Sequence, residues 1–413
     1  MKKVVITGMG IISPIGNSID EYFESLSQGL CGIGAITRFD ASDYKVKVAG
    51  EVKGFNPGAF GISPRSARHM DLFTQYALAC AKQAVEESGI AGNVIPERFG
   101  VYVGSGIGGM NTFVKEDRKL LERGPDRISP FFIPMLISNI AAGTIAIEYG
   151  AQGPNLPVVT ACATSTTAIG EAYRAIAHGY ADAIIAGGSE ATIEPLAVAG
   201  FASCQALSLS ENPLEASLPF DIRRGGFVMG EGAGVLILEE KEHAEKRGAK
   251  IYAQICGYGN SCDAHHITAP RPDGACAARA ISMAAKEAGI SRGDSVYINA
   301  HGTGTAMNDV SETLAIKLAL GEDAARVAKI SSTKSMTGHM LGAAGAAEAI
   351  ACVMAVSRGV IPPTIGLDQP DPHCDLDYTP NVAVKKQVTL ALSTSLGFGG
   401  HNGCVAFRPY NGA

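Results

Sequence analysis

The chain has 413 residues, 46% hydrophobic and 18% charged, so it exceeds a usual single domain and can bury a large core. Its 34 Lys and Arg residues against 40 Asp and Glu residues give a net charge of −6, which argues against a general nucleic-acid surface and means that an acidic partner must meet a local basic patch. Because no run approaches the roughly 18 apolar residues of a membrane span, and the short run after the N-terminal lysines stops at Gly8 and Gly10, we expect a cytoplasmic protein with no membrane partner.

Short Val- and Ile-rich runs alternate with segments of helical periodicity along the whole chain, which is typical of an α/β protein. Runs without polar alternation indicate strands covered on both faces. The predicted strands lie at residues 4–7, 99–103, 158–160, 183–186, 251–255, 296–299, 328–331 and 390–394, and clear helical patterns lie at residues 73–88, 275–288 and 343–356. The stretch 227–238 is typical of the closing strand of a first half. We therefore divide the chain into residues 1–250 and 251–413.

Residues 108–129 are predicted to form an exposed insertion. The stretch is charged, and a proline-bounded apolar segment follows it at residues 128–135. This combination indicates a lid, a subunit contact or plain surface structure, and the pattern leaves these alternatives open.

Cys162 stands where a β-branched run ends in small residues and a helical pattern begins, marked by Ile169, Tyr173 and Ile176. This spacing predicts a thiol on the first turn of a helix. Free backbone N–H groups and the positive end of the helix dipole favour a thiolate there, so we expect a nucleophile near neutral pH and a covalent thioester enzyme. The ten cysteines contain no CxxC pair, which disfavours zinc and disulfides and favours a reducing compartment.

Two histidines follow predicted strands and stand beside glycines. His301 lies in Asn-Ala-His-Gly-Thr-Gly-Thr at residues 299–305, and His339 ends Ser-Thr-Lys-Ser-Met-Thr-Gly-His at residues 332–339. With Cys162 they form a plausible nucleophile and acid–base constellation, because the carboxyl ends of strands host sites in α/β sheets. The glycine-rich stretch 104–109 is an imperfect dinucleotide motif, and no phosphate-binding loop is present, so phosphate chemistry is disfavoured.

From end to end, the sequence resembles β-ketoacyl-[acyl carrier protein] synthases of the thiolase superfamily, most closely the synthase II branch of bacterial fatty-acid elongation. The segments that carry the resemblance are 128–134, 219–221, 226–234, 299–303, 332–339 and 395–400. The resemblance implies an α/β, thiolase-like five-layer α-β-α-β-α sandwich built from two pseudo-repeated halves. It also implies a homodimer that uses no metal and no organic cofactor.

The implied reaction is a decarboxylative Claisen condensation of acyl-[acyl carrier protein] with malonyl-[acyl carrier protein]. By resemblance, Cys162 takes the acyl group as a thioester, and the backbone N–H groups of Cys162 and Phe398 hold the oxyanion. His301 and His339, as neutral rings, donate hydrogen bonds to the malonyl thioester oxygen and stabilise the enolate. A water activated by His301 to capture the CO2 is a further hypothesis.

Lys334 is paired in this family with the glutamate at the position of Glu348. Two roles remain open from the sequence: positive potential near the histidines, or a buried salt bridge that only holds the loop.

The resemblance also assigns substrate contacts. Thr303 and Thr305 bind the pantetheine arm, and Ile107, Phe201 and Phe398 line or gate the acyl pocket, with the bulky Ile107 typical of the synthase II branch. Further assignments are Ile133, which reaches the partner subunit's pocket, and Arg65, Arg68 and Arg127, which dock the acidic acyl carrier protein.

The chain departs from the family pattern at three positions. Gln205 replaces a basic residue, which predicts a weaker or rearranged docking surface, whereas Gly304 and Gly225 stand where serine and aspartate are usual. None of these changes removes a catalytic group.

Other functions stay in play at this point. A synthase I or a polyketide ketosynthase would share the motifs. A non-catalytic chain-length partner would share the fold, but such partners resemble ketosynthases that lost the thiol, and Cys162 is retained. A cysteine hydrolase would need one histidine as general base and would not need the Lys334 motif.

Overall fold

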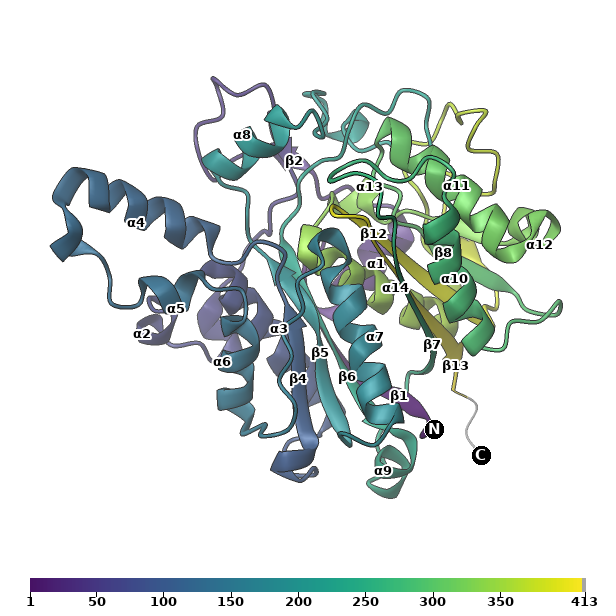
Figure 1. Cartoon of the computed structure of the whole chain (residues 1–413), viewed down its shortest axis with the longest axis horizontal. Helices are drawn as coiled ribbons and strands as arrows, with labels where there is room; N and C mark the ends of the chain where they lie inside the picture. Colours follow the sequence, from purple (N-terminus) through teal and green to yellow (C-terminus); the bar gives the residue numbers. More distant parts are fainter. Residues whose placement is uncertain (411–413) are drawn as a thin grey trace.

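The computed structural model describes residues 1–410, and its main strands form one mixed nine-stranded sheet (Figure 1). The strand order is β4-β5-β6-β1-β7-β13-β12-β8-β9. The bounds are β1 Val4–Ile12, β4 Phe99–Gly104, β5 Ala183–Glu190, β6 Gly232–Glu240, β7 Ala253–Cys262, β8 Val296–Asn299, β9 Lys329–Ser331, β12 Leu390–Gly397 and β13 His401–Pro409. Two small two-stranded sheets pair β2 Gly34–Ala35 with β3 Val48–Ala49 and β10 Val360–Ile361 with β11 Val384–Lys385.

The predicted helices at 73–88, 275–288 and 343–356 are confirmed as α3, α10 and α14. The helices are α1 Ile19–Gln28, α2 Pro64–Ala67, α3 Leu72–Ser88, α4 Met110–Arg123, α5 Phe132–Leu136, α6 Ile140–Tyr149, α7 Thr164–Ala177, α8 Pro195–Ser203, α9 Lys241–Lys246, α10 Ala275–Glu287, α11 Ala306–Leu320, α12 Glu322–Val327, α13 Lys334–Thr337 and α14 Ala344–Arg358. The predicted insertion at 108–129 contains α4, and with α5 it projects from the body of the molecule (Figure 1).

Alternating side chains on the strands separate three hydrophobic cores. On β6, Leu236 and Leu238 face a core shared with α7 and α14, whereas Val235 and Ile237 face a core shared with α3 and α6. On β13, alternate residues likewise face the α7–α14 core and a third core under α10 and α11. Helices α7 and α14 therefore lie between two half-sheets that carry further helices on their outer faces, which is the predicted five-layer arrangement.

The two half-sheets are joined at their centre. Residues 4–6 of β1 pair antiparallel with residues 253–255 of β7, so the hydrogen bonding runs through both halves without a break.

The predicted strand at residues 158–160 is wrong. The chain enters this segment beside β4, where Leu156 donates its N–H to the Val101 carbonyl. Pro157 then offers no N–H to continue the ladder, and the N–H of Thr160 turns to the Thr164 hydroxyl at 3.0 Å. The other seven predicted strands are confirmed, and each starts within two residues of its predicted position, but β1, β5, β7 and β12 end three to seven residues later than predicted. The predicted closing strand at 227–238 starts only at residue 232, and β13 is not among the predicted strands.

One helical stretch is apolar on average, although it contains no uninterrupted apolar run of the kind that we sought in the sequence as a sign of a membrane span. Residues 341–358, comprising a 3₁₀ turn and α14, are long and apolar enough to cross a membrane, but 89% of that stretch is buried inside the fold. Its apolar character is therefore that of a core helix.

Candidate active site

Cys162 lies in a tight 3₁₀ turn, Ala161–Ala163, that leads directly into α7. Ala161 has a φ of 49°, a left-handed conformation that costs a non-glycine residue about 1–2 kcal/mol. A Cβ on Gly397 would lie 3.3 Å from the Cys162 backbone nitrogen, so the end of β12 presses against this turn. The predicted placement of the thiol at the start of a helix is confirmed, and the turn holds it in a strained, fixed position.

The predicted thiolate near neutral pH is wrong for the substrate-free protein. Burial raises the pKa of Cys162 to about 12; the Lys334 cation and the Phe398 N–H group lower it, and the buried Glu190 carboxyl raises it further. Around the buried sulfur, the free-energy cost of an unsolvated negative charge exceeds the stabilisation of the thiolate by Lys334 and the Phe398 N–H group. Cys162 therefore carries its proton at neutral pH before a substrate arrives.

A cavity of about 300 Å³ brings together residues from both halves of the chain. The predicted site residues that line it are Cys162, His301, His339, Thr303, Thr305 and Phe398. The two imidazole rings are nearly perpendicular, with centroids 5.3 Å apart, and the two threonine hydroxyls are 3.0 Å apart. The cavity thus places the thiols of Cys162 and Cys204, two imidazoles and two threonine hydroxyls around one volume.

His301 is fixed through its backbone by a buried carboxylate. Its N–H donates to Glu312 at 2.7 Å and to the Thr394 hydroxyl at 3.1 Å, and the next N–H, of Gly302, also donates to Glu312 at 2.7 Å. This carboxylate pins the turn that follows β8, so the ring of His301 is presented to the cavity without a side-chain hydrogen bond at Nδ1.

His339 has a defined tautomer. Its Nδ1 accepts the N–H of Leu341 at 3.3 Å, so the ring proton resides on Nε2. Nε2 is buried and has no partner within residues 1–410, while the N–H of His339 donates to the Val228 carbonyl at 2.7 Å. Phe227 packs against the ring in a T-shaped contact at 5.1 Å. The imidazole is therefore held with its donor N–H free.

Both histidines are neutral at physiological pH. Burial lowers the pKa of His301 and of His339 well below the usual value, and the nearby Lys334 cation lowers both further. Lys334 itself forms a fully buried ion pair with Glu348. The cation thus lies close enough to act on both rings while its own charge is balanced.

Ile107 and Phe201 lie outside the open cavity. They pack in one apolar cluster with Cys162, and the rings of Phe201 and Phe398 are 6.4 Å apart. The space beside the thiol is therefore filled by side chains in this structure. Ile133 on α5 is not brought to the cavity at all, since 57% of it is exposed on the projecting segment.

The three predicted docking arginines are exposed and form no ion pair within residues 1–410. Arg65 and Arg68 belong to α2 and its C-terminus, and Arg127 ends a 3₁₀ turn that precedes α5. The rings of His69 and Phe131 stack at 4.0 Å and hold these two segments together. Three unpaired positive charges are thus gathered beside one another.

The departures from the family pattern cause no strain at the glycines. Gly304 has a φ of 74°, which glycine adopts without strain, and a Cβ on Gly225 would meet open space. Gln205 lines the cavity mouth and has a φ of 55°.

Sequence reasoning missed Glu312 and Phe227, which hold the histidines. The sequence carries only a weak signal for Glu312, which is one of two acids, with Asp309, in the stretch that forms α11. Phe227 lies in a glycine-rich stretch that the sequence marks only as part of the predicted closing strand and of the resemblance.

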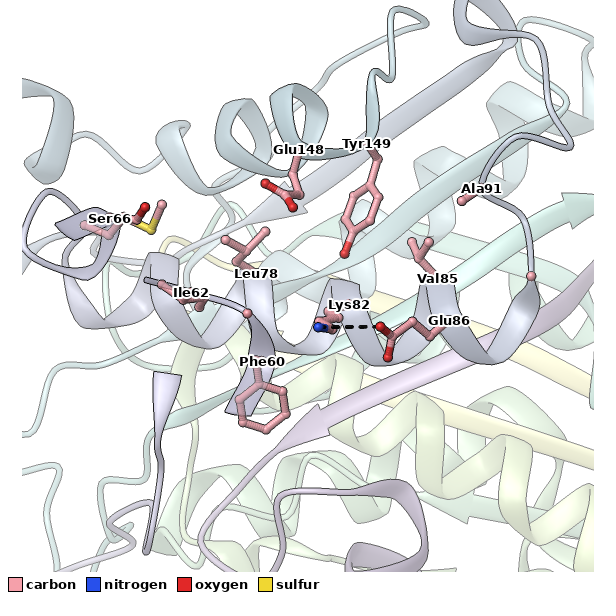
Figure 2. A pocket seen from close by; sticks show the side chains of 13 residues that line it. Phe60, Ile62, Ser66, Leu78, Lys82, Val85, Glu86, Ala91, Glu148 and Tyr149 are labelled. Carbon is pink, nitrogen blue, oxygen red and sulfur yellow. Dashed lines mark ion pairs between the residues drawn. The ribbon is translucent and has the colours of Figure 1, made fainter. Parts of the chain in front are cut away.

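A second cavity of about 390 Å³ lies between α3 and α6 (Figure 2). Leu78 and Val85 form part of its wall, Tyr149 points toward α3, and Lys82 pairs with Glu86 at 3.5 Å. None of the predicted site residues lines this cavity, and it contains no nucleophile with a neighbouring base.

Comparisons with known proteins place the whole chain in one family. The model of the β-ketoacyl synthase N-terminal domain matches residues 1–244, and that of the C-terminal domain matches residues 252–368. The chain is 52% identical to the 3-oxoacyl-[acyl-carrier-protein] synthase 2 of Synechocystis sp., covering 99% of this chain and 98% of that protein. It is 50% identical to the protein of the same name from Staphylococcus aureus strain COL, covering 99% of each.

Solved structures give the same result. An ishigamide ketosynthase/chain length factor aligns with a TM-score of 0.92 and 36% identity, covering 99% of this chain and all of that one. A type II polyketide ketosynthase solved with its acyl-carrier protein aligns with a TM-score of 0.90 and 35% identity, over 99% of this chain and all of that one. The chain belongs to the β-ketoacyl synthase family.

Proposed function

We propose that this protein elongates fatty acyl chains by decarboxylative condensation. Acyl-[acyl carrier protein] and malonyl-[acyl carrier protein] give 3-oxoacyl-[acyl carrier protein], CO2 and free carrier. The observation that carries this proposal is the single cavity that holds Cys162 with two neutral imidazoles, one of which has its Nε2–H free. The high identity to the two synthase 2 proteins supports the same reaction.

In the first half-reaction the Cys162 sulfur attacks the acyl thioester carbon. The carrier thiolate leaves and takes up the proton that Cys162 gives up, so the transfer is balanced without a permanent base. The N–H groups of Cys162 and Phe398 are assigned to the tetrahedral oxyanion, because backbone dipoles there need little reorganisation. The raised pKa of Cys162 makes proton loss concerted with, or dependent on, substrate arrival.

In the second half-reaction malonyl carrier protein loses CO2. The electrons of the broken C–C bond move into the thioester as an enolate, whose oxygen receives hydrogen bonds from His301 and His339. The enolate carbon then attacks the acyl-Cys162 carbonyl, and the Cys162 thiolate leaves. Neutral rings suit this role, since each can donate one N–H to the enolate oxygen. Neither ring carries a charge that would form an ion pair with the malonyl carboxylate and so oppose its loss as CO2.

The acyl carrier protein is the proposed partner of the arginine cluster, namely Arg65, Arg68 and Arg127. An acidic carrier meets three exposed, unpaired positive charges, and its pantetheine arm would pass Thr303 and Thr305 on its way to the thiol.

The homodimer is also a proposal. Several apolar side chains are exposed on the projecting segment, on α6 and on the irregular segment that runs beside β4. They are Ile133, Ile137, Ile147, Leu156 and Val159. Exposed apolar side chains on neighbouring elements are typical of a subunit interface. There Ile133 would reach the pocket of the partner subunit.

Two broader assignments complete the proposal. All ten cysteines are free, which suits a reducing cytoplasm. The half comprising residues 1–250 supplies the thiol, and the half comprising residues 251–413 supplies both histidines.

A polyketide ketosynthase is the second candidate. It is favoured by the alignment with the type II polyketide ketosynthase, although that alignment reaches only 35% identity, against 50 to 52% for the synthase 2 proteins. A non-catalytic chain-length partner is disfavoured by the cavity thiol.

Intact-protein mass spectrometry tests the proposal directly. Mixing the protein with hexadecanoyl or hexanoyl carrier protein should add one acyl mass, and that mass should be absent in Cys162→Ala. Addition of malonyl carrier should then release CO2 and 3-oxoacyl carrier. Absence of 3-oxoacyl product with every chain tested would overturn the proposed function.

A further inference from the structure

Glu190, the last residue of β5, is a fully buried carboxylate with no ion-pair partner within residues 1–410. Its Oε1 accepts the Ser105 hydroxyl at 2.9 Å and the Ile107 N–H at 3.3 Å. Its Oε2 accepts the N–H groups of Gly106 at 2.9 Å and Gly342 at 3.1 Å. Burial raises the pKa of Glu190 to about 7, and these hydrogen bonds oppose that rise. A buried carboxyl group is costly unless its hydrogen bonds are made, so this cradle of donors is a built feature of the fold.

Two chain segments meet at this carboxylate. A Cβ on Gly106 or on Gly342 would lie 2.8 Å from Oε2 of Glu190, and a Cβ on Gly342 would lie 2.4 Å from the Gly106 nitrogen. Only glycine fits such an approach. The carboxylate therefore fastens the loop after β4, residues 105–109, to the turn at residues 341–343.

Each of these segments carries a wall of the reaction site. The first presents Ile107, which packs in the apolar cluster beside Cys162. The second presents Leu341, whose N–H donates to His339 Nδ1 and whose φ of 47° is strained for a non-glycine residue. Movement of the carboxylate's partners would thus shift the acyl side and the histidine side together.

We propose that Glu190 is a positioning residue that sets acyl chain-length selectivity by fixing the backbone of Ile107. This inference rests on the proposed function, in which the acyl chain enters beside Cys162. Because the Ile107 backbone is held, only rotation of a β-branched side chain can open the space, and such side chains have few rotamers. Long chains need that space more than short chains do.

Glu190→Gln tests the proposal with nearly unchanged shape. In either orientation the amide sets its NH2 group against a backbone N–H of the loop after β4, that of Ile107 or that of Gly106, so the variant releases this loop. We expect the rate of Cys162 acylation by hexadecanoyl carrier, divided by that for hexanoyl carrier, to rise about tenfold. The rates are read by intact-protein mass spectrometry without malonyl carrier, so the ratio is obtained even if condensation itself fails.

The control for loss of a buried carboxylate is Glu239→Gln. Glu239 is equally buried and accepts hydrogen bonds from the Thr7 hydroxyl and from Arg247, with which it is also ion-paired. It lies at the opposite end of the β5–β6 pair, where it faces Ala183. A purely structural role for Glu190 predicts that both variants lower both rates equally, and an unchanged ratio in folded Glu190→Gln overturns the proposal. If Glu190→Gln is insoluble, Ser105→Ala, which removes one hydrogen bond to the carboxylate, decides the matter. A rise of about threefold in its ratio supports the proposal, and no rise overturns it.

Discussion

The thiol and the histidines of the cavity are held in opposite ways. Cys162 sits on a strained 3₁₀ turn, and burial raises its pKa to about 12. His301 and His339 are more deeply buried, are pinned by hydrogen bonds to their own backbone and turns, and have lowered pKa values. All three groups are therefore uncharged before substrate binds.

This difference indicates that the thiol and the histidines serve different half-reactions. The thiol must change its protonation state to form a covalent bond, whereas the histidines act without changing theirs. Acyl transfer should thus depend on the thiol, its turn and the Phe398 N–H group but not on the histidines, whereas decarboxylation should depend on His301 and His339.

The substitution Cys162→Ala should abolish acylation of the enzyme and, with it, condensation. Without this sulfur no acyl-enzyme forms at position 162, and condensation should fall by about 10⁴-fold or more, because Cys204, the other thiol that lines the cavity, does not lie on the turn at the start of α7. Product formation from acyl and malonyl carriers measures this loss.

Cys162→Gln supplies the counterpart. It should not condense either, but it should keep malonyl decarboxylation, since both histidines remain. Condensation by Cys162→Ala would show that the nucleophile lies elsewhere.

The substitution His339→Ala should impair decarboxylation and leave acyl transfer nearly intact. Loss of one preformed donor to the enolate should slow decarboxylation by about 10²–10³-fold, while acylation of Cys162 stays within about tenfold of the wild type. Release of labelled CO2 and the acyl mass adduct measure the two rates on one sample. His301→Ala should behave alike, and an equal loss of acylation in either variant would contradict the division of labour.

Lys334→Met distinguishes the two roles that the sequence left open for this residue. Removal of one member of a buried ion pair should destabilise the protein by about 3–5 kcal/mol, which thermal unfolding would detect. Decarboxylation should fall by about 10- to 50-fold, because the positive charge of Lys334, which lowers the pKa of both histidines beyond the effect of burial, is gone.

The double variant Lys334→Met/Glu348→Leu is the control. It leaves no unpaired charge, so most of the stability should return, yet decarboxylation should stay low. Full recovery of decarboxylation would reduce Lys334 to a structural role.

Alkylation of Cys162 tests the corrected protonation state. With a pKa of about 12, the thiolate fraction rises about tenfold for each pH unit below that value, so the iodoacetamide rate should rise in the same proportion from pH 7 to pH 9. Peptide mass spectrometry separates Cys162 from the exposed Cys204 and Cys262. A plateau between pH 7 and pH 8 would restore the expectation of a thiolate at rest.

The sequence predicted those features that its local pattern controls. Hydrophobic runs located seven strands, and small residues before a helical pattern placed Cys162 at a helix start. The strand at 158–160 failed because Pro157 removes a ladder donor, an effect that hydrophobicity does not register.

The pKa of Cys162 and the roles of Glu190 and Glu312 could not be predicted, for a different reason. The pKa depends on burial by distant segments and on Lys334, 172 residues away in the chain. The two carboxylates bind mainly backbone N–H groups, and a backbone donor leaves no mark in the sequence. Such residues emerge only once the fold is known.

The smallest expected effect concerns Gln205 at the mouth of the cavity, where the carrier protein would dock for both half-reactions. Gln205 is exposed there and stands where the family has a basic residue, so Gln205→Arg should add a fourth positive charge near the incoming acidic carrier. Since a rim charge acts mainly on encounter, KM for both carriers should fall about two- to threefold at low salt, with kcat unchanged. Gln28→Arg on α1 adds the same charge to an element that does not line the cavity, and it should leave KM as it was. In about 0.5 M salt the gain should vanish, because screening removes it; a gain that survives high salt, or a change in kcat, would show that position 205 acts on the reaction rather than on docking.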